Sequence, residues 1–269
     1  MPTTPDLARA TFVADVRAEV ARLFRAPQME LRIVAMNALM VCVGWFVLPG
    51  GLKDWLFDNL HGPIAFAVVL ETWMIGDVTS TNLLAHDRPA ALDALYDGSV
   101  RRLMRVKTAA LATIIGPVGA AAALVIGYEH GRTQTALVAA PLFLALPFAA
   151  IAVASCLGVI APYRPRSLRW RWERRSVATL RWAFLVLVPY TLVSAVVTAL
   201  IFPPKLLADV VTHHAHRLAH ASPTTFGLLA LTGGVLSFAV YTGATVGADR
   251  LARLRRTALI RHLQDPEAA

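Results

Sequence analysis

The stretch RRLMRVKTAALATIIGPVGAAAALVIG, residues 101–127, places four cationic side chains directly before twenty residues that carry no charge. A helix needs about 20 apolar residues to cross the roughly 30 Å of hydrocarbon in a bilayer. Residues 108–127 therefore predict a membrane-spanning helix with a basic segment at one membrane surface. Five further apolar runs lie on either side of it, at 33–49, 63–85, 136–160, 177–202 and 225–248.

The Lys and Arg residues alternate between the gaps that separate these runs. All but four of the 26 lie in residues 1–32, 86–107, 161–181 and 249–269. Short loops rich in Lys and Arg stay on the cytoplasmic side, because they resist translocation. The sequence thus predicts an all-α integral membrane protein with six transmembrane helices and both termini in the cytoplasm. A soluble helical bundle is disfavoured, since 57% of residues are hydrophobic and 16% are charged.

Three regions follow from this pattern. Residues 1–32 contain an amphipathic segment, 6–26, which we expect to lie in the cytoplasmic interface or to pack on the protein as an ordinary solvated helix. Residues 33–248 form the six-helix transmembrane domain, and residues 249–269 form a basic cytoplasmic tail. Small residues recur every fourth position in the third run (around Gly116 and Gly119) and the last run (Ala239, Gly243, Gly247), a spacing that lets helices approach closely.

The chain carries none of the short motifs of the common catalytic sites. It has no GxxxxGK[ST] loop for nucleotide phosphates, no GxSxG nucleophile elbow and no HExxH zinc helix. We therefore expect that it is not an enzyme. If it moves a substrate against a gradient, the energy has to come from a partner protein or from an ion.

Glu71 and Asp77 lie near the middle of the second run, where a charged side chain costs roughly 2.5–3.5 kcal/mol on the translocon scale. One interpretation is a polar lining of a substrate path. The other is a protonated or hydrogen-bonded acid at a contact between helices, and the sequence does not decide between the two. The candidates for the substrate path are Glu71, Asp77, Ser80, Thr81 and Asn82.

The inner loop 86–107, HDRPAALDALYDGSVRRLMRVK, predicts a short helix that starts at Pro89 and ends at Gly98. Ser99 is then expected to cap a second helix, 100–107, that leads into the third span. Such a helix is either a surface for a soluble partner or a connector that lies on the membrane. The candidate partner contacts are Asp87, Arg88, Leu92, Leu95, Tyr96, Arg101 and Arg102.

The order of these features resembles the permease subunits of bacterial ATP-binding-cassette exporters of the second type. The likeness rests on the N-terminal amphipathic helix, the pair Asp87-Arg88, the Gly98-Ser99 boundary, Lys107 and the stretch SCLGVIAPY at 155–163, which is similar to actinobacterial members. Many members have Glu-Arg-Gly where this chain has Asp87-Arg88-Pro89. The resemblance covers nearly the whole chain in layout.

The resemblance implies a multi-pass protein of the bacterial inner membrane that dimerises with a second six-span permease. Separate ATPase subunits, which carry ATP and Mg, would dock on a coupling helix within 86–107. The chain is then expected to export an amphipathic drug-like or lipid-like substrate by alternating access. The alternative is an ion-coupled secondary transporter that uses Glu71 or Asp77 as proton carrier.

The outer loop 203–224 contains the remaining unusual pattern. Asp209, His213, His216 and His220 fall on one face of a helix. Imidazole and carboxylate groups suit Zn²⁺ or Cu²⁺, but one straight helix cannot surround a metal with all four. We favour a short amphipathic helix on the outer interface over a metal site.

Overall fold

The structure is a computed structural model that describes residues 4–25, 29–53, 63–80, 83–160, 162, 191–192, 195–196 and 223–265. Within these residues the chain is helical and has no β-strand, which confirms the expected all-α class. Its helices are α1 (Thr4–Leu23), α2 (Met29–Val47), α4 (Pro63–Ser80), α5 (Arg88–Asp97), α6 (Val100–Glu129), α7 (Thr133–Ile160), α10 (Pro223–Leu254) and α11 (Arg256–Gln264).

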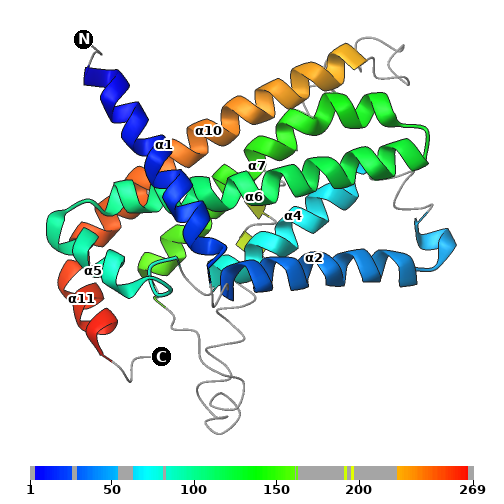
Figure 1. Ribbon diagram of the computed structural model, residues 1–269. Coiled ribbons are helices and arrows are strands. Elements are labelled where there is room, and N and C mark those ends of the chain that lie inside the picture. Colours follow the sequence, from blue (N-terminus) through cyan, green and yellow to red (C-terminus); the bar gives the residue numbers. More distant parts are fainter. Residues whose placement is uncertain are drawn as a thin grey trace, which may run out of the picture.

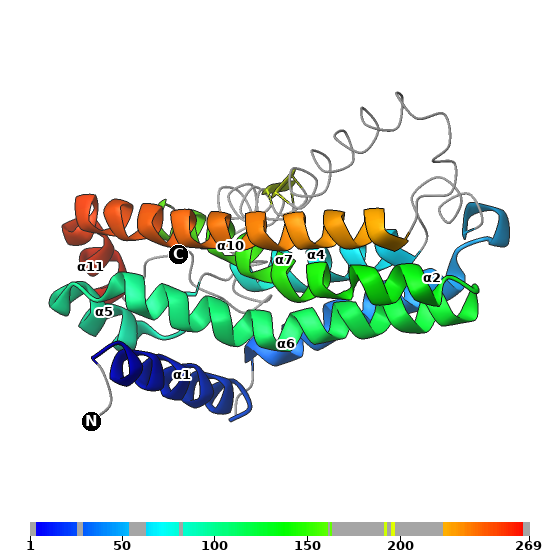
Figure 2. The same ribbon diagram turned by 90° about the horizontal axis from the view of Figure 1, so that it is seen from above.

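The long helices lie lengthwise in an elongated bundle. α7 packs most extensively against α10 and α6, and α4 fits between α2, α6 and α7. The helices α1, α5 and α11 gather at one end of the bundle, together with the first turns of α6 (Figures 1 and 2). We call this the basic end, because α6 begins there with Arg101, Arg102 and Arg105.

Four helices are long and apolar enough to cross a membrane: Glu30–Val47, Val100–Glu129, Thr133–Ile160 and Ala230–Leu254. They correspond to the first, third, fourth and sixth runs of the sequence. The described apolar part of α4, Phe66–Gly76, is shorter than a span, and almost all of the run 177–202 lies outside the described residues. The structure thus has the helices of a membrane protein, four of them of spanning length.

Large hydrophobic side chains cover the outside of the bundle. On α2, Leu39, Phe46 and Val47 are 63%, 79% and 77% exposed, and on α10, Leu231 and Val235 are 65% and 64% exposed. An outer surface of this kind is typical of contact with lipid or another protein, since soluble monomers rarely expose large contiguous apolar patches.

The small residues of α6 bring helices close together, as expected. A methyl group added at Gly116 would lie 3.1 Å from the Cα of Leu144, and one added at Gly127 would lie 2.7 Å from the Cβ of Ala136. The expected stripe on α10 makes no such close approach within the described part of the chain. Ala239 and Gly243 are exposed, and no atom of the described residues lies within 4 Å of a methyl group added at Gly243 or Gly247.

α7 and α10 run in the same direction. Gly227 lies beside Val138 near their first turns, and the thiol of Cys156 donates to the carbonyl of Ala244 at 3.5 Å near their last turns. The guanidinium of Arg255, which follows α10, donates to the carbonyl of Val159 at 3.0 Å. The end of α7 and the start of α10 therefore lie at opposite ends of the bundle.

The segment expected as an inner loop, 86–107, is largely helical. Asp87 caps α5, since its carboxylate accepts the N–H of Ala90 at 3.4 Å, and Gly98 ends the helix with a left-handed backbone at φ 73°. α6 begins at Val100 and continues without a break through the third run, so 100–107 are its first two turns. Ser99 occupies the position before α6, but its side chain makes no capping hydrogen bond, so the expected cap was wrong.

Candidate functional site

Glu71 is the most deeply buried acid among the described residues. It lies on α4, is 1% exposed, and both of its carboxylate oxygens lack a hydrogen-bond partner within the described part of the chain. The carboxyl group occupies the space above Gly119 of α6, where an added methyl group would lie 2.6 Å from the Glu71 Cγ and Cδ. Glycine at position 119 therefore makes room for an acid inside the bundle.

The other candidates for the substrate path are not placed in the same detail. Asp77 and Ser80 belong to the last turns of α4, but their side chains lie outside the described residues, as do Thr81 and Asn82. The structure consequently places Glu71 alone of these five side chains. It lies among apolar neighbours that include Leu70, Met74 and Ile115.

A charged cluster joins three helices at the basic end. Lys107 of α6 is 2% exposed, and its Nζ donates to Oε1 of Glu19 and to Oδ2 of Asp87, each at 3.0 Å. Arg22 of α1 donates to both oxygens of Glu19, at 2.8 and 2.9 Å, and to Oε1 of Glu30 at 3.0 Å. We call these five residues the Lys107 cluster; they connect α1, α2, α6 and the turn before α5.

The carboxylates of the Lys107 cluster remain ionised despite their burial. Burial alone would raise the pKa of Glu19, but the hydrogen bonds from Arg22 and the charge of Lys107 outweigh it and hold the pKa below its usual value. Burial also acts to raise the pKa of Asp87, and the charge and hydrogen bond of Lys107 again lower it overall. The cluster thus contains three carboxylates and two cations, and each carboxylate accepts a hydrogen bond from Arg22 or Lys107.

His86 lies beside the Lys107 cluster. Burial lowers the pKa of its imidazole, and the charge of Lys107 acts in the same direction, while Glu30 opposes them. Its Nε2 is buried and has no hydrogen-bond partner within the described residues. The imidazole is therefore neutral near pH 7.

α5 packs its apolar side against the C-terminal helix of the same chain. Ala91 and Leu95 are buried in one hydrophobic cluster with Leu259 and Leu263 of α11. Polar contacts accompany this packing: Arg88 donates to the carbonyl of Leu263, Arg256 donates to the carbonyl of Tyr96 at 3.0 Å, and Gln264 donates to the Tyr96 hydroxyl at 3.1 Å.

The candidate partner contacts therefore divide into two groups. Leu95 is 2% exposed, Leu92 is half-buried and Arg88 is engaged with α11. Tyr96 is 53% exposed, Arg101 is exposed, and Arg102 forms an exposed ion pair with Asp15 of α1 at 2.6 Å. A partner would reach the second group and the neighbouring Asp93, which is also exposed.

The metal candidates Asp209, His213, His216 and His220 lie outside the described residues. Within the described residues, no group of three or more His, Cys, Asp or Glu side chains could hold a metal ion.

The Lys107 cluster was missed at the level of sequence, although its signals are visible there. Glu19 and Glu30 are acids in or beside a segment otherwise rich in arginine, and Lys107 is the last charged residue before an apolar run. Each of these residues is ordinary alone. Their meeting depends on how α1 folds back onto α6, which the periodicity of a single helix does not encode.

Comparisons with protein-family models, with curated proteins and with solved structures found no match to this chain.

Proposed function

We propose that the chain is the permease subunit of an ATP-driven exporter in the bacterial inner membrane. In this proposal it crosses the membrane six times with both termini in the cytoplasm. It pairs with a second six-span permease, and a cytoplasmic ATPase subunit, which holds ATP and Mg, drives it. The substrate is an amphipathic drug-like or lipid-like molecule that leaves by alternating access.

The Lys107 cluster is the observation that carries this proposal. Asp87 caps α5 and also accepts a hydrogen bond from Lys107 of α6, while Lys107 contacts Glu19 of α1. A force applied to α5 therefore reaches the spanning helix α6 and the peripheral helix α1 through short, buried contacts. A stiff joint of this kind suits a protein whose spans are moved by a partner at one end.

The parallel direction of α7 and α10 supports six spans. Because the end of α7 and the start of α10 lie at opposite ends of the bundle, an odd number of crossings is needed between them. The apolar run 177–202 supplies one crossing. α1, α5 and α11 also gather at a single end of the bundle, as expected if both termini and the inner loop share one membrane side (Figure 2).

The exposed residues of α5 define where the ATPase would dock. Since Leu95 is covered by this chain's own α11, the docking surface consists of Asp93 and Tyr96, with the exposed Arg101 beside them on α6. α11 then acts as a brace behind the coupling helix. A second chain finds an open apolar face with small residues on α10, around Gly243.

Co-purification tests the partner directly. The full chain is expressed together with an ATP-binding-cassette ATPase from the same organism, purified through a tag on this chain alone, and the subunits are counted by native mass spectrometry. We expect two permease and two ATPase subunits, together with ATP hydrolysis that a transported substrate stimulates. Recovery of the chain without any ATPase from such cells would contradict the proposal.

Single-cysteine labelling tests the topology. Cys42 and Cys156 are first replaced by alanine, and Asp93→Cys and Tyr128→Cys are then compared in intact cells with a membrane-impermeant reagent. Both positions are exposed, and they lie at opposite ends of α6 and its preceding helix. We expect labelling at 128 only; labelling at 93 would place α5 outside the cytoplasm and exclude ATPase docking there.

Substitutions at α5 test the coupling step. Tyr96→Ala with Asp93→Arg is expected to lower substrate-stimulated ATP hydrolysis at least severalfold, because both side chains are exposed at the proposed docking surface. Arg261→Glu on the exposed side of α11 is the matched control. Full transport by the double variant would place the docking surface elsewhere.

The carboxyl of Glu71, which has no hydrogen-bond partner among the described residues, favours one alternative, an ion-coupled secondary transporter with Glu71 as proton carrier. The two functions predict different responses to Glu71→Gln. A proton carrier loses uphill transport completely in this variant, whereas an ATP-driven exporter keeps transport with a changed substrate range. Transport that persists without any ATPase and stops with an uncoupler would support the alternative.

A further inference from the structure

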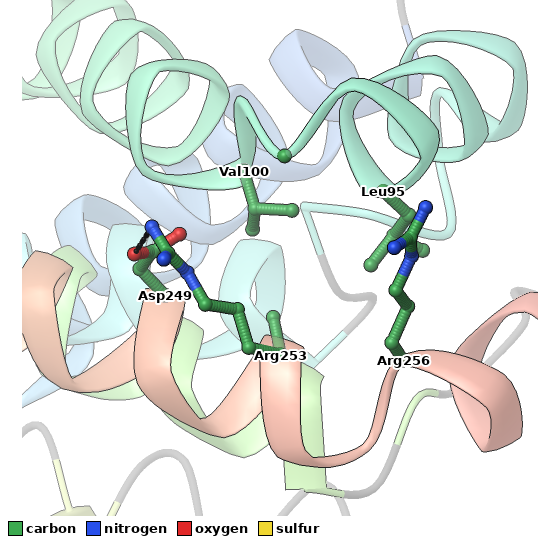
Figure 3. A pocket seen from close by; sticks show the side chains of 7 residues that line it. Leu95, Val100, Asp249, Arg253 and Arg256 are labelled. Atoms are coloured by element: carbon green, nitrogen blue, oxygen red, sulfur yellow. Dashed lines mark hydrogen bonds and ion pairs between the residues drawn. The ribbon is translucent and has the colours of Figure 1, made fainter.

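A cavity of about 230 Å³ opens at the basic end, between α5 and the first turn of α6 on one side and the junction of α10 and α11 on the other. Leu95 and Val100 form an apolar wall, while Asp249, Arg253 and Arg256 supply charged groups (Figure 3). The cavity is smaller than the roughly 300–1,000 Å³ that drug-sized ligands occupy. It therefore suits a small polar group rather than the exported substrate.

Asp249 brings an unsatisfied acceptor to this cavity. The residue is 6% exposed, and its Oδ2 accepts a hydrogen bond from Arg253 at 2.7 Å. Its Oδ1 is buried and has no hydrogen-bond partner within the described residues. A buried acceptor without a donor costs free energy. A ligand whose N–H or O–H group donates to Oδ1 would form the hydrogen bond that this acceptor lacks.

The two arginines supply an excess of positive charge. Arg256 donates one N–H group to the carbonyl of Tyr96 at 3.0 Å, and the Arg253 side chain is 69% exposed beyond its pair with Asp249. A guanidinium has five donors, so both retain several for a ligand. Two guanidinium groups against one carboxylate favour an anion, and phosphate matches their planar geometry.

The position of the cavity along α6 indicates where such a phosphate comes from. α6 has 30 residues, a length of about 45 Å, which exceeds the roughly 30 Å of hydrocarbon. The excess lies at its charged first turns, where Val100 meets Asp249 across the cavity. If α6 crosses a membrane, this places the cavity at the depth of the lipid headgroups.

We propose that this cavity binds a phospholipid headgroup that ends in a hydrogen-bond donor. The phosphate lies between Arg253 and Arg256, and the terminal ammonium or hydroxyl group donates to Oδ1 of Asp249. The exposed Arg253 side chain rotates to admit the donor. A choline headgroup carries the same phosphate but no N–H group, so the site discriminates against it. The bound lipid bridges α5 to α10 and holds the basic end together.

A pair of matched lipids tests the proposal on the purified full chain in detergent. Dihexanoyl phosphatidylethanolamine and dihexanoyl phosphatidylcholine differ only in methylation of the terminal nitrogen, and native mass spectrometry reports their binding. We expect the ethanolamine lipid to bind about 10-fold more tightly. Equal binding of the two lipids to the unmodified chain would overturn the proposal.

Variants separate the two parts of the site. Asp249→Asn is expected to remove the preference for ethanolamine over choline, and Arg256→Gln to weaken both lipids by a similar factor. Arg261→Gln removes an equal charge from the same helix outside the cavity and is expected to change neither. If Asp249→Asn does not fold, Arg256→Gln and the comparison of lipids on the unmodified chain still decide. A preference that survives in Asp249→Asn, or unchanged binding of both lipids by Arg256→Gln, would contradict the assignment.

Free phosphoethanolamine distinguishes the source of the headgroup. It carries the same phosphate and ammonium groups without acyl chains, and we expect it to bind at least 10-fold more weakly than the lipid. Binding as tight as that of the lipid would overturn the membrane source. None of these measurements needs an ATPase or transport, so failure of the exporter proposal and failure of this site are observed separately.

Discussion

Lys107 and Glu71 are both almost completely buried, at 2% and 1% exposure, yet the surroundings of the two side chains are opposite in kind. Lys107 has two carboxylate partners at 3.0 Å, in a cluster at the basic end. Glu71 lies in the middle of the bundle without a hydrogen-bond partner in the described part of the chain, in space left by Gly119. The same burial therefore accompanies a cation with two carboxylate partners and an acid without a hydrogen-bond partner among the described residues.

The difference indicates two roles. A buried charge that is surrounded by opposite charges holds elements in register, and its loss leaves partners unpaired. A buried acid without partners is costly when ionised, so it is either neutral or placed for an ion or substrate. The Lys107 cluster thus behaves as a structural joint, and Glu71 is the position where a functional effect is expected without a large loss of stability.

Removal of the Lys107 side chain gives the largest expected effect. Lys107→Met keeps the length and apolar stem of the side chain but leaves Glu19 and Asp87 without their shared cation. Breaking a buried pair costs on the order of 3–5 kcal/mol. We expect a loss of that size, measured by equilibrium unfolding of the purified chain in mixed detergent micelles.

A double variant tests whether the contribution of Lys107 to stability is electrostatic. Combining Lys107→Met with Asp87→Asn removes the carboxylate whose remaining cation, Arg22, lies 3.9 Å away, and is expected to recover part of the loss. If the double variant is as unstable as the sum of the single variants, the coupling between the two side chains is absent and the joint is not electrostatic.

Gly119→Ala has the second largest effect, because its methyl group would overlap the Glu71 side chain at 2.6 Å. Overpacking of this kind costs about 1–3 kcal/mol. The control is the same substitution in a Glu71→Ala background, where the space is empty and the cost should nearly vanish. Equal costs in both backgrounds, by unfolding in micelles, would show that the Glu71 carboxyl does not occupy this space.

Glu71 and Lys107 also show what the sequence can and cannot predict. The apolar runs predicted α2, α4, α6, α7 and α10, since a helix in lipid has to be apolar over its spanning length, and Pro89 and Gly98 predicted the bounds of α5 by local backbone chemistry. Glu71 was recognised because a charge inside an apolar run is visible in one dimension. Its neighbour Gly119 and the partners of Lys107 depend on contacts between helices, which the chain order does not reveal.

The cover of α11 over α5 is a second feature that the sequence left open. Leu95 of α5 was a candidate contact for a soluble partner, with a connector that lies on the membrane as the alternative, because an amphipathic helix between two spans has an apolar side to bury. The tail of the same chain buries it instead, through Leu259 and Leu263. The amphipathic pattern of α5 predicts that a partner exists, but not which segment provides it.

Acid should weaken the Lys107 cluster. The pKa values of Glu19 and Asp87 are lowered in the folded chain, so their contribution is complete above the unfolded values near 4 and is lost as the pH falls through the folded ones. The lowered pKa of His86 acts earlier, since the unfolded imidazole takes up a proton near pH 6.5 while the folded one resists it.

In a Glu71→Gln background, which removes a buried acid that would titrate over the same range, stability is therefore expected to be level above about pH 7, to decline slowly below pH 6.5 and to decline further near pH 4. Unfolding midpoints in micelles across this range provide the measurement, and His86→Gln should remove the first decline alone. A stability that rises on acidification from pH 7 to pH 5 would contradict the assignment of these groups.

Removal of the Arg102 side chain gives the smallest expected loss of stability, against which the loss in Lys107→Met is compared. It also pairs with an acid of α1, Asp15 at 2.6 Å, but its side chain is 58% exposed and that of Asp15 is 37% exposed. Exposed ion pairs contribute about 0.2–1 kcal/mol, because water already solvates both charges. Arg102→Gln should therefore cost no more than about 1 kcal/mol, and the cost should decrease further in high salt. A loss as large as that of Lys107→Met would mean that distance, rather than burial, decides which contacts hold α1 onto α6.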